Sequence, residues 1–463
     1  MPTPSRSEPT PPRLGPATAA VKRRLSATLR LDRPFATRPP PSRGFLSTRP
    51  ADPKTLEAFD LAAGFRAAAV ACGQRSGPGL DLALVAGDRP CTAAGVFTTN
   101  RIKAAPVLYD QEVLSRKATT IRAVIANAGC ANACTGDSGM EDARHMATLT
   151  AAAIGCAADQ VLVLSTGVIG RRLDMDKIAR GIEALGSGWR GPGAGVSAIE
   201  SGGAAAARAI LTTDTRAKTA TLDFESAGRT IALRGFAKGA GMIHPNMATM
   251  LAVVTTDASI APDLMQTALK AAVARSFNRV SVDGDMSTND TVLLLASGAS
   301  GASVDAARLG PFITALTAVC TSLARQIARD GEGATRLVEI LVSGARDESE
   351  AHTVADSIAC SPLVKTAIHG GDPNWGRVLA AAGYSGARID PDRLRLSFGI
   401  AAEAVTVVRD GLPAEFDARA ASACLKRDPV FVHLDLGLGE AEATVWTCDF
   451  SADYVAINAH YTT

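Results

Sequence analysis

The segment Lys238 to Met250, KGAGMIHPNMATM, is the most distinctive stretch of the chain. It places two glycines, a proline and an asparagine between two runs of strand-forming residues, and such punctuation builds a tight, specific turn. On residue type alone, Thr249 is a β-branched residue that starts a strand, Lys238 is a solvated charge and His244 is a turn histidine. The segment therefore predicts a strand, a sharp turn and a second strand.

Outward from this turn, short apolar strands alternate with longer helical stretches from about Gly64 onward. The predicted strands are Leu80–Val85, Ala123–Ala126, Val161–Leu164, Thr219–Phe224, Thr230–Leu233, Thr249–Thr256, Thr291–Ala296 and Leu337–Val342. The predicted helices are Met140–Ile154, Pro262–Ala274 and Thr314–Ala328. No linker rich in Pro, Ser or Gly divides this body, so the pattern predicts one mixed α/β unit without internal repeats.

Composition excludes several classes of protein. The chain has 463 residues, of which 47% are hydrophobic and 20% charged, enough apolar material for a large core. No run approaches the roughly 18 apolar residues that a membrane-spanning helix needs. Aromatic residues are only 4%, and no basic stripe is interleaved with them. We therefore expect neither a membrane nor a nucleic acid as partner.

The N-terminal segment, residues 1–56, differs from the rest of the chain. Its first 50 residues hold 11 of the 24 prolines and nine Arg, but only two acidic residues, so we expect it to be disordered. Val21, Leu25 and Leu29 recur every four residues beside basic side chains, a pattern that resembles a mitochondrial presequence. The mitochondrial matrix is the predicted location; a plastid, or the cytoplasm of a bacterium with a misassigned start codon, are the alternatives.

Metal and cofactor motifs are absent from the sequence pattern. The nine cysteines are dispersed, and Cys130 and Cys134 lack the second Cys or His pair of a zinc motif. The polar series at residues 283, 285, 287 and 289 imitates a calcium loop but has no correctly spaced closing Glu. No Walker or dinucleotide-binding motif is present. We expect a reducing compartment, no metal and no cofactor.

A second segment of interest, Ser165 to Gly170, follows the predicted strand Val161–Leu164. Its glycines free backbone N–H groups to point outward, and such a turn can hold a developing oxyanion. It can equally be an ordinary strand exit. The residues themselves leave both interpretations open.

Several long strings make the chain resemble the ornithine acetyltransferase family of arginine biosynthesis, whose activity is that of a glutamate N-acetyltransferase. The resemblance covers all but about the first 58 residues. It rests on GFRAA from Gly64, AGVFTTN from Ala94, TGVIG from Thr166, KGAGMIHPNMAT from Lys238, SFNRVSVDGDMSTNDT from Ser276 and YVAIN from Tyr454.

The resemblance implies a layered α-β-β-α sandwich that cuts itself between Ala248 and Thr249. The products would be an alpha chain, residues 57–248 of the catalytic unit, and a beta chain, residues 249–463, assembled as a heterotetramer. Thr249 would be the nucleophile, with its new N-terminal amine as the base. Thr166 and Gly167 match the family's oxyanion hole.

The implied reaction moves an acetyl group from N-acetylornithine to Thr249 and then to glutamate. By family pattern, the substrate-binding residues are Thr212, Lys238, Thr249, Glu332, Asn458 and Thr463. Charge matching suggests that Lys238 pairs with a substrate carboxylate and Glu332 with the ornithine ammonium. Members that also accept acetyl-CoA as donor share these motifs, so the sequence does not separate them from single-function members.

Two alternatives stay open at this point. The first is an aminopeptidase or amidohydrolase of the same self-cleaving design, in which water takes the acyl group. The second is an uncleaved scaffold or binding protein built on the same fold. The intact Ala248-Thr249 pair and the intact Thr166-Gly167 pair favour the acetyltransferase.

Overall fold

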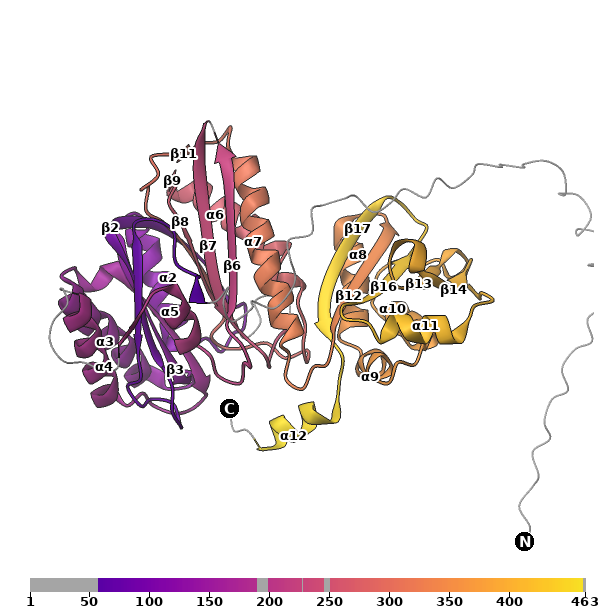
Figure 1. The fold of residues 1–463 in the computed structure, drawn as a ribbon, viewed down its shortest axis with the longest axis horizontal. Helices are drawn as coiled ribbons and strands as arrows, with labels where there is room; N and C mark the ends of the chain where they lie inside the picture. The colour runs from indigo at the N-terminus through magenta and orange to yellow at the C-terminus, as the bar shows by residue number, and fades with distance from the viewer. Residues whose placement is uncertain (1–56, 190–198, 227, 245–249, 461–463) are drawn as a thin grey trace, which may run out of the picture. The chain divides into compact units, whose positions relative to one another are not determined.

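The computed structural model describes residues 57–189, 199–226, 228–244 and 250–460 (Figure 1). The predicted N-terminal segment, residues 1–56, lies outside the described residues. The described chain is mixed α/β, as the sequence pattern predicts. Its helices include none that is long and apolar enough to cross a membrane.

A long strand, β2 (Leu82–Phe97), links two groups of strands in a nine-stranded sheet. Its first half lies antiparallel between β1 (Phe65–Val70) and β3 (Ile121–Cys130). β3 then pairs in parallel with β4 (Val161–Val168), and β1 pairs with the short β5 (Glu200–Ser201). The β2–β3 register shifts between Ala86 and Cys91, where β2 passes from the first group of strands to the second.

The second half of β2 is antiparallel to β10 (Thr291–Ala296), which is parallel to β8 (Leu251–Thr256). β8 pairs with β7 (Arg229–Lys238), and β7 with β6 (Lys218–Ser226). β7 and β8 are the strands that the distinctive segment connects. A separate two-stranded sheet consists of β9 (Ser259–Ile260) and β11 (Ser303–Val304).

Both faces of β8 and β10 are buried, which explains why these two strands read as continuous apolar runs. Leu251 and Val253 belong to the core that they share with β1 to β4. Ala252 and Val254 point the other way, into a core formed with α6 (Pro262–Ala274) and α7 (Leu309–Arg329). The alternation places two sheet layers against each other with helices outside, as the resemblance implies. Helices in contact with the first group are α2 (Ala105–Lys117), α3 (Gly136–Ile154), α4 (Met175–Trp189) and α5 (Gly203–Ala209).

The C-terminal part forms a third, six-stranded sheet with a hydrophobic core of its own. Only its strand β12 was predicted from the sequence. In spatial order the sheet contains β15 (Leu412–Pro413), β14 (Val405–Arg409), β13 (Arg395–Phe398), β16 (Val430–Asp435), β12 (Leu337–Ala345) and β17 (Ala441–Cys448). Its helices are α8 (Glu348–Ala359), α9 (Pro362–Gly370), α10 (Trp375–Gly383) and α11 (Ala418–Leu425), and α12 (Ala452–His460) follows β17. Short 3-10 turns lie at Ala158–Gln160, Phe277–Arg279, Pro391–Arg393 and Ala401–Glu403.

The predicted turn at Ser165 to Gly170 is wrong in its starting point, because β4 continues through Val168. Side-chain amides hold this extension in place: Asn127 Oδ1 accepts a hydrogen bond from Ser165 Oγ at 2.7 Å, and Asn289 Nδ2 donates to Ser165 O at 2.8 Å. The extended strand delivers Thr166 and Gly167 to the end of the sheet.

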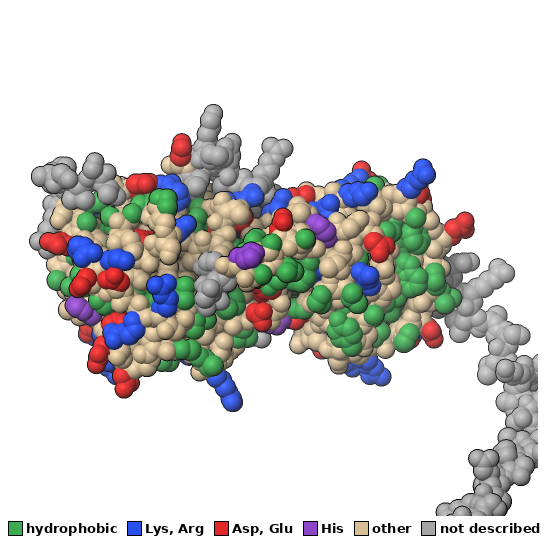
Figure 2. All heavy atoms as spheres, turned by 90° about the horizontal axis from the view of Figure 1, so that it is seen from below, with side chains coloured by type: hydrophobic (Ala, Val, Ile, Leu, Met, Phe, Trp, Pro, Cys, Tyr) green, Lys and Arg blue, Asp and Glu red, His purple; other side chains and the backbone are tan. Residues whose placement is uncertain are grey.

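On the face that Figure 2 draws, Lys and Arg side chains are interspersed with Asp and Glu among the described residues. The described part of this face therefore shows no continuous basic stripe of the kind that follows a phosphate backbone.

Candidate active site

The structure brings most of the predicted site residues together around one pocket of about 250 Å³. It is built from the end of β4, the loop before β6, the end of β7, the segment after α7, and α12. The predicted residues that line it are Thr166, Gly167, Thr212, Lys238, Glu332 and Asn458. The remaining predicted residues lie outside the described residues: Ala248, Thr249 and Thr463.

The Thr166-Gly167 pair is held in a fixed geometry that requires glycine. Gly167 has φ +131°, and a Cβ there would lie 2.3 Å from the backbone carbon of Gly129 on the neighbouring strand. Thr166 is buried, with 3% of its surface exposed. Two hydrogen bonds from Asn289 Nδ2, to Ser165 O at 2.8 Å and Ala131 O at 2.6 Å, fix the adjoining backbone. The pair is therefore preorganised.

Lys238 is not the solvated charge that its residue type suggests, because only 2% of its surface is exposed. Its Nζ donates to Thr166 Oγ1 at 3.3 Å and lies 4.0 Å from Asp214 Oδ2. Burial lowers the pKa of Lys238, and the Asp214 carboxylate offsets part of that effect. The distinctive segment thus begins with a buried amine that contacts the predicted oxyanion pair.

A buried carboxylate, Asp214, organises the surroundings of Lys238, and no motif in the sequence marks it as a site residue. Its Oδ1 accepts from Lys218 Nζ and, at 2.6 Å, from Gly239 N, while Oδ2 accepts from Thr212 N at 3.1 Å. Burial by itself would raise the pKa of Asp214, but the ammonium groups of Lys218 and Lys238 outweigh burial and hold it below its ordinary value. Asp214 therefore fixes Thr212 and the start of the distinctive segment in one network.

A second charged residue of the pocket, Glu332, lies against Gly241. A Cβ at Gly241 would be only 2.4 Å from the Glu332 carboxylate, so glycine at this position leaves room for the carboxylate where it lies. Glu332 N donates to Ala240 O at 2.8 Å, and Glu332 Oε2 accepts from Asn458 Nδ2 at 2.8 Å. The pocket is thus lined by both a buried ammonium and a buried carboxylate.

The calcium-like series supports the backbone of the distinctive turn. Asp283 Oδ2 accepts from Met242 N at 2.6 Å, and Oδ1 from Ile243 N at 2.8 Å. These bonds hold Met242 at a positive φ of 57°. Burial raises the pKa of Asp283, and the backbone N–H groups offset part of the rise. Both carboxylate oxygens of Asp283 thus accept hydrogen bonds from the turn, and the Asn289 amide donates to Ser165 O of β4.

The strand that follows Thr249 is anchored beside the pocket. Met250 N donates to Asp290 Oδ1 at 2.8 Å, and Leu251 pairs with Lys238 in the β7–β8 register. Asp290 is buried, and burial raises its pKa well above the ordinary value. Sequence reasoning did not single out Asp290. Its place in the long Ser276 to Thr291 string was the signal that could have identified it.

Comparison with known proteins identifies relatives over most of the chain. The ArgJ family matches residues 66–463. The arginine biosynthesis bifunctional protein ArgJ of Symbiobacterium thermophilum is 48% identical over 410 residues, which cover 87% of this chain and 97% of that protein. The protein of the same name from Dehalococcoides mccartyi is 46% identical over 405 residues, covering 86% and 96%.

Solved structures give similar matches over shorter spans. The arginine biosynthesis bifunctional protein ArgJ from Bacillus halodurans is 42% identical, with a TM-score of 0.43, over 45% of this chain and 98% of that chain. The ornithine acetyltransferase of Mycobacterium tuberculosis, solved in complex with ornithine, is 39% identical, with a TM-score of 0.33, over 40% of this chain and 92% of that chain.

Proposed function

The chain belongs to the ArgJ family, and on that premise we propose that it is a self-cleaving acetyltransferase of arginine biosynthesis. It takes the acetyl group from N2-acetylornithine, releases ornithine, and passes the acetyl group to glutamate to give N-acetylglutamate. The observation that carries this proposal is the meeting of Thr166, Gly167, Lys238 and Glu332 in one pocket beside the start of β8.

Self-cleavage supplies the nucleophile and its base in one residue. Thr249 Oγ attacks the carbonyl carbon of Ala248, the peptide nitrogen leaves as the amine of Thr249, and water hydrolyses the resulting ester. The new amine has a reference pKa of about 7.7 to 8.0, so it can accept the proton of its own hydroxyl near neutral pH. The bond from Met250 N to Asp290 supports this step, because it anchors the residue next to Thr249.

The oxyanion pair is completed by Lys238. Its ammonium donates to Thr166 Oγ1, so the oxygen serves as an acceptor and the hydroxyl hydrogen is free to point toward a developing negative oxygen. The Gly167 N–H is the second donor. Lys238 thereby orients Thr166 in addition to presenting a positive charge to a substrate carboxylate.

The two charged residues of the pocket suit amino-acid substrates. The side-chain ammonium of N-acetylornithine would bind the Glu332 carboxylate, which Asn458 orients through its 2.8 Å hydrogen bond. The substrate carboxylate would bind toward Lys238. Because acetylation consumes the α-amine of both N-acetylornithine and N-acetylglutamate, one site can hold donor and product in turn.

Further parts of the proposal rest on the sequence and the family. The two chains stay together, since β7 and β8 pair across the cleavage point, and the family resemblance extends this to a heterotetramer of two copies of each chain. The reaction needs no metal or cofactor, because an acyl-threonine intermediate conserves the activated acetyl group. Residues 1–56 direct the protein to the mitochondrial matrix, a proposal supported by the recurrence of Val21, Leu25 and Leu29 beside basic side chains. The relatives are named bifunctional, and we assign the second function to acetyl-CoA as an alternative acetyl donor.

Acetyl-transfer assays test the proposal. Purified protein with N-acetylornithine and glutamate should yield ornithine and N-acetylglutamate in equal amounts. Ornithine with free acetate, formed at the same rate without glutamate, would identify an amidohydrolase instead. Acetyl-CoA with glutamate alone should also give N-acetylglutamate; if no product forms, the enzyme only recycles acetyl groups.

A further inference from the structure

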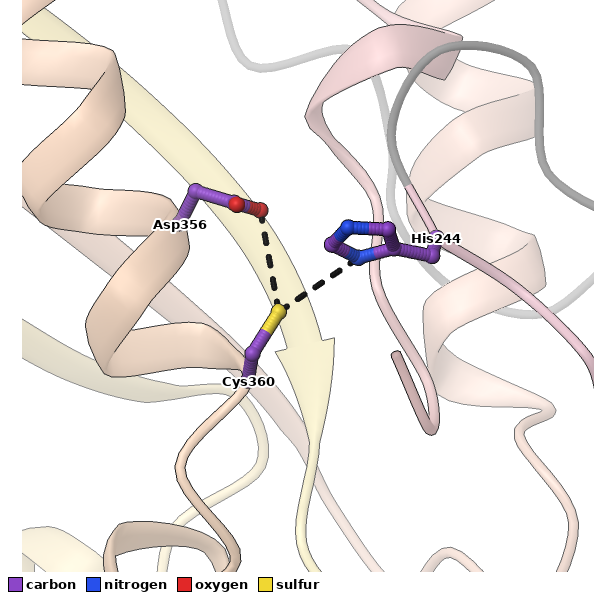
Figure 3. A group of neighbouring side chains, drawn as sticks. All are labelled: His244, Asp356 and Cys360. Atoms are coloured by element: carbon purple, nitrogen blue, oxygen red, sulfur yellow. Dashed lines mark hydrogen bonds between the residues drawn. The ribbon is translucent and has the colours of Figure 1, made fainter. Parts of the chain in front are cut away.

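A second group of chemically reactive side chains lies outside the pocket. His244 belongs to the distinctive segment, whereas Asp356 and Cys360 lie at the end of α8, one helical turn apart. The i, i+4 spacing places Asp356 and Cys360 on the same side of the helix. Figure 3 shows both of them facing the His244 ring, and their candidate ligand atoms all lie within 4.8 Å of one another.

Cys360 contacts both of the other side chains in this group. Its Sγ lies 3.5 Å from His244 Nδ1 and 3.8 Å from Asp356 Oδ1, distances at which a thiol forms hydrogen bonds. The three side chains therefore converge on one point.

The same distances fit ligands around a common ion. Zinc binds Cys sulfur at about 2.3 Å and His nitrogen at about 2.0 to 2.1 Å, so the sulfur and nitrogen of a tetrahedral site lie about 3.6 Å apart. The corresponding sulfur–oxygen separation is also about 3.6 Å. The two distances from Cys360 Sγ, 3.5 and 3.8 Å, match both values.

We propose that His244, Asp356 and Cys360 form a Zn²⁺ site, with water in the fourth position. A thiolate, an imidazole and a carboxylate are a donor set that zinc favours. Ser281 Oγ lies 3.4 Å from both Cys360 Sγ and His244 Nδ1, where its hydroxyl can donate to the thiolate from outside the ligand set.

A nucleophilic Cys–His pair is the competing interpretation of this group. The Asp356 carboxylate favours the metal interpretation, because it adds a third ligand atom within 4.8 Å of the other two, whereas a nucleophilic pair needs only the Cys and the His.

The position of the site gives the ion a structural role, which rests on the proposed self-cleavage. Cleavage before Thr249 leaves His244 on one product and both Asp356 and Cys360 on the other. The ion would then join the two chains and fix the end of the segment that leads to the cleavage point. Metal binding itself does not depend on cleavage.

The test is zinc binding by the full chain after chelator treatment and desalting, measured as metal per chain and by competition with a chromophoric chelator. Wild type, Thr249→Ala and Cys134→Ser, in which an exposed cysteine elsewhere is changed, should each bind one equivalent. Cys360→Ser and His244→Asn should bind more than about 100-fold more weakly. Binding by Thr249→Ala separates this proposal from the cleavage proposal.

Two further readouts keep the result interpretable. Cobalt should give a thiolate-to-metal absorption band in wild type and Cys134→Ser that is missing in Cys360→Ser. Zinc should raise the melting temperature of wild type but not of a Cys360→Ser protein that still unfolds cooperatively. The proposal is overturned if wild type binds no zinc after chelator treatment. It is also overturned if Cys360→Ser and His244→Asn bind zinc as tightly as wild type.

Discussion

Replacing Thr166 with Val removes the proposed oxyanion hydroxyl while nearly preserving the shape of the side chain. Loss of one such donor typically lowers kcat by about 10² to 10³, or roughly 2.7 to 4 kcal/mol of transition-state stabilisation. Because Thr166 Oγ1 also accepts from Lys238 at 3.3 Å, the change leaves a buried ammonium with Asp214, 4.0 Å away, as its nearest charge partner. We therefore expect a stability loss of about 1 to 3 kcal/mol as well.

The assay is the steady-state rate of ornithine release with saturating N-acetylornithine and glutamate, corrected for the cleaved fraction by mass spectrometry. Thr256→Val is the matched control, because Thr256 is a buried strand threonine whose hydroxyl accepts a hydrogen bond from the Ala258 backbone N–H at 3.3 Å. It should keep near-normal kcat. Lys238→Met should lower kcat too. The double variant with Thr166→Val should lose less transition-state stabilisation than the two single variants lose together, since both changes act on one donor. A cleaved Thr166→Val enzyme with kcat within about threefold of wild type would refute the oxyanion role.

Three further predictions concern the carboxylates around the pocket. Glu332→Gln should raise the apparent KM for N-acetylornithine by about 10-fold or more, the value of one charged hydrogen bond, with a smaller effect on glutamate; an unchanged KM in initial-rate kinetics would contradict the ammonium pairing. The folded-state pKa of Asp214 is depressed, so its stabilising effect is present above its unfolded pKa of about 3.9 and is lost as pH falls through the folded value. At pH 7 the free energy of unfolding of Asp214→Asn should therefore be about 3 to 5 kcal/mol below that of wild type. Chemical denaturation should show this difference narrowing below pH 4. A difference that does not change with pH would count against the buried ion pair. Asp290→Ala should slow self-cleavage because Met250 N loses its acceptor, whereas Asp290→Asn should cleave nearly normally because an amide oxygen can accept the same hydrogen bond. Equal cleavage rates of the two variants on gels would show that this acceptor is dispensable.

The local elements were largely predictable because their patterns are strong. The helix Pro262–Ala274 and the strand Thr291–Ala296 have the predicted bounds, since a proline at the helix start and an uninterrupted apolar run mark them. β4 runs past its predicted end because Asn127 and Asn289 support it, and Asn289 lies more than a hundred residues along the chain. Such long-range support leaves no local pattern.

The third sheet and the burial of Lys238 were not predictable for the same reason. β12 pairs with β16 and β17, whose residues follow about ninety or more positions later, and periodicity does not report which strands become neighbours. Lys238 is buried because Asp214 and Thr166 converge on it from other elements. The resemblance identified the pocket residues, whereas the roles of Asp214, Asp283 and Asp290 in holding the segments in place emerged only from their contacts.

The most direct test of the central claim is the intact mass of the purified protein, with Thr249→Ala measured beside it. The account predicts that wild type separates under denaturing conditions into two chains, the second beginning at Thr249, and that Thr249→Ala remains one chain. A wild-type protein that stays whole while catalysing acetyl transfer would contradict it, because Thr249 would then have no free amine to act as the base.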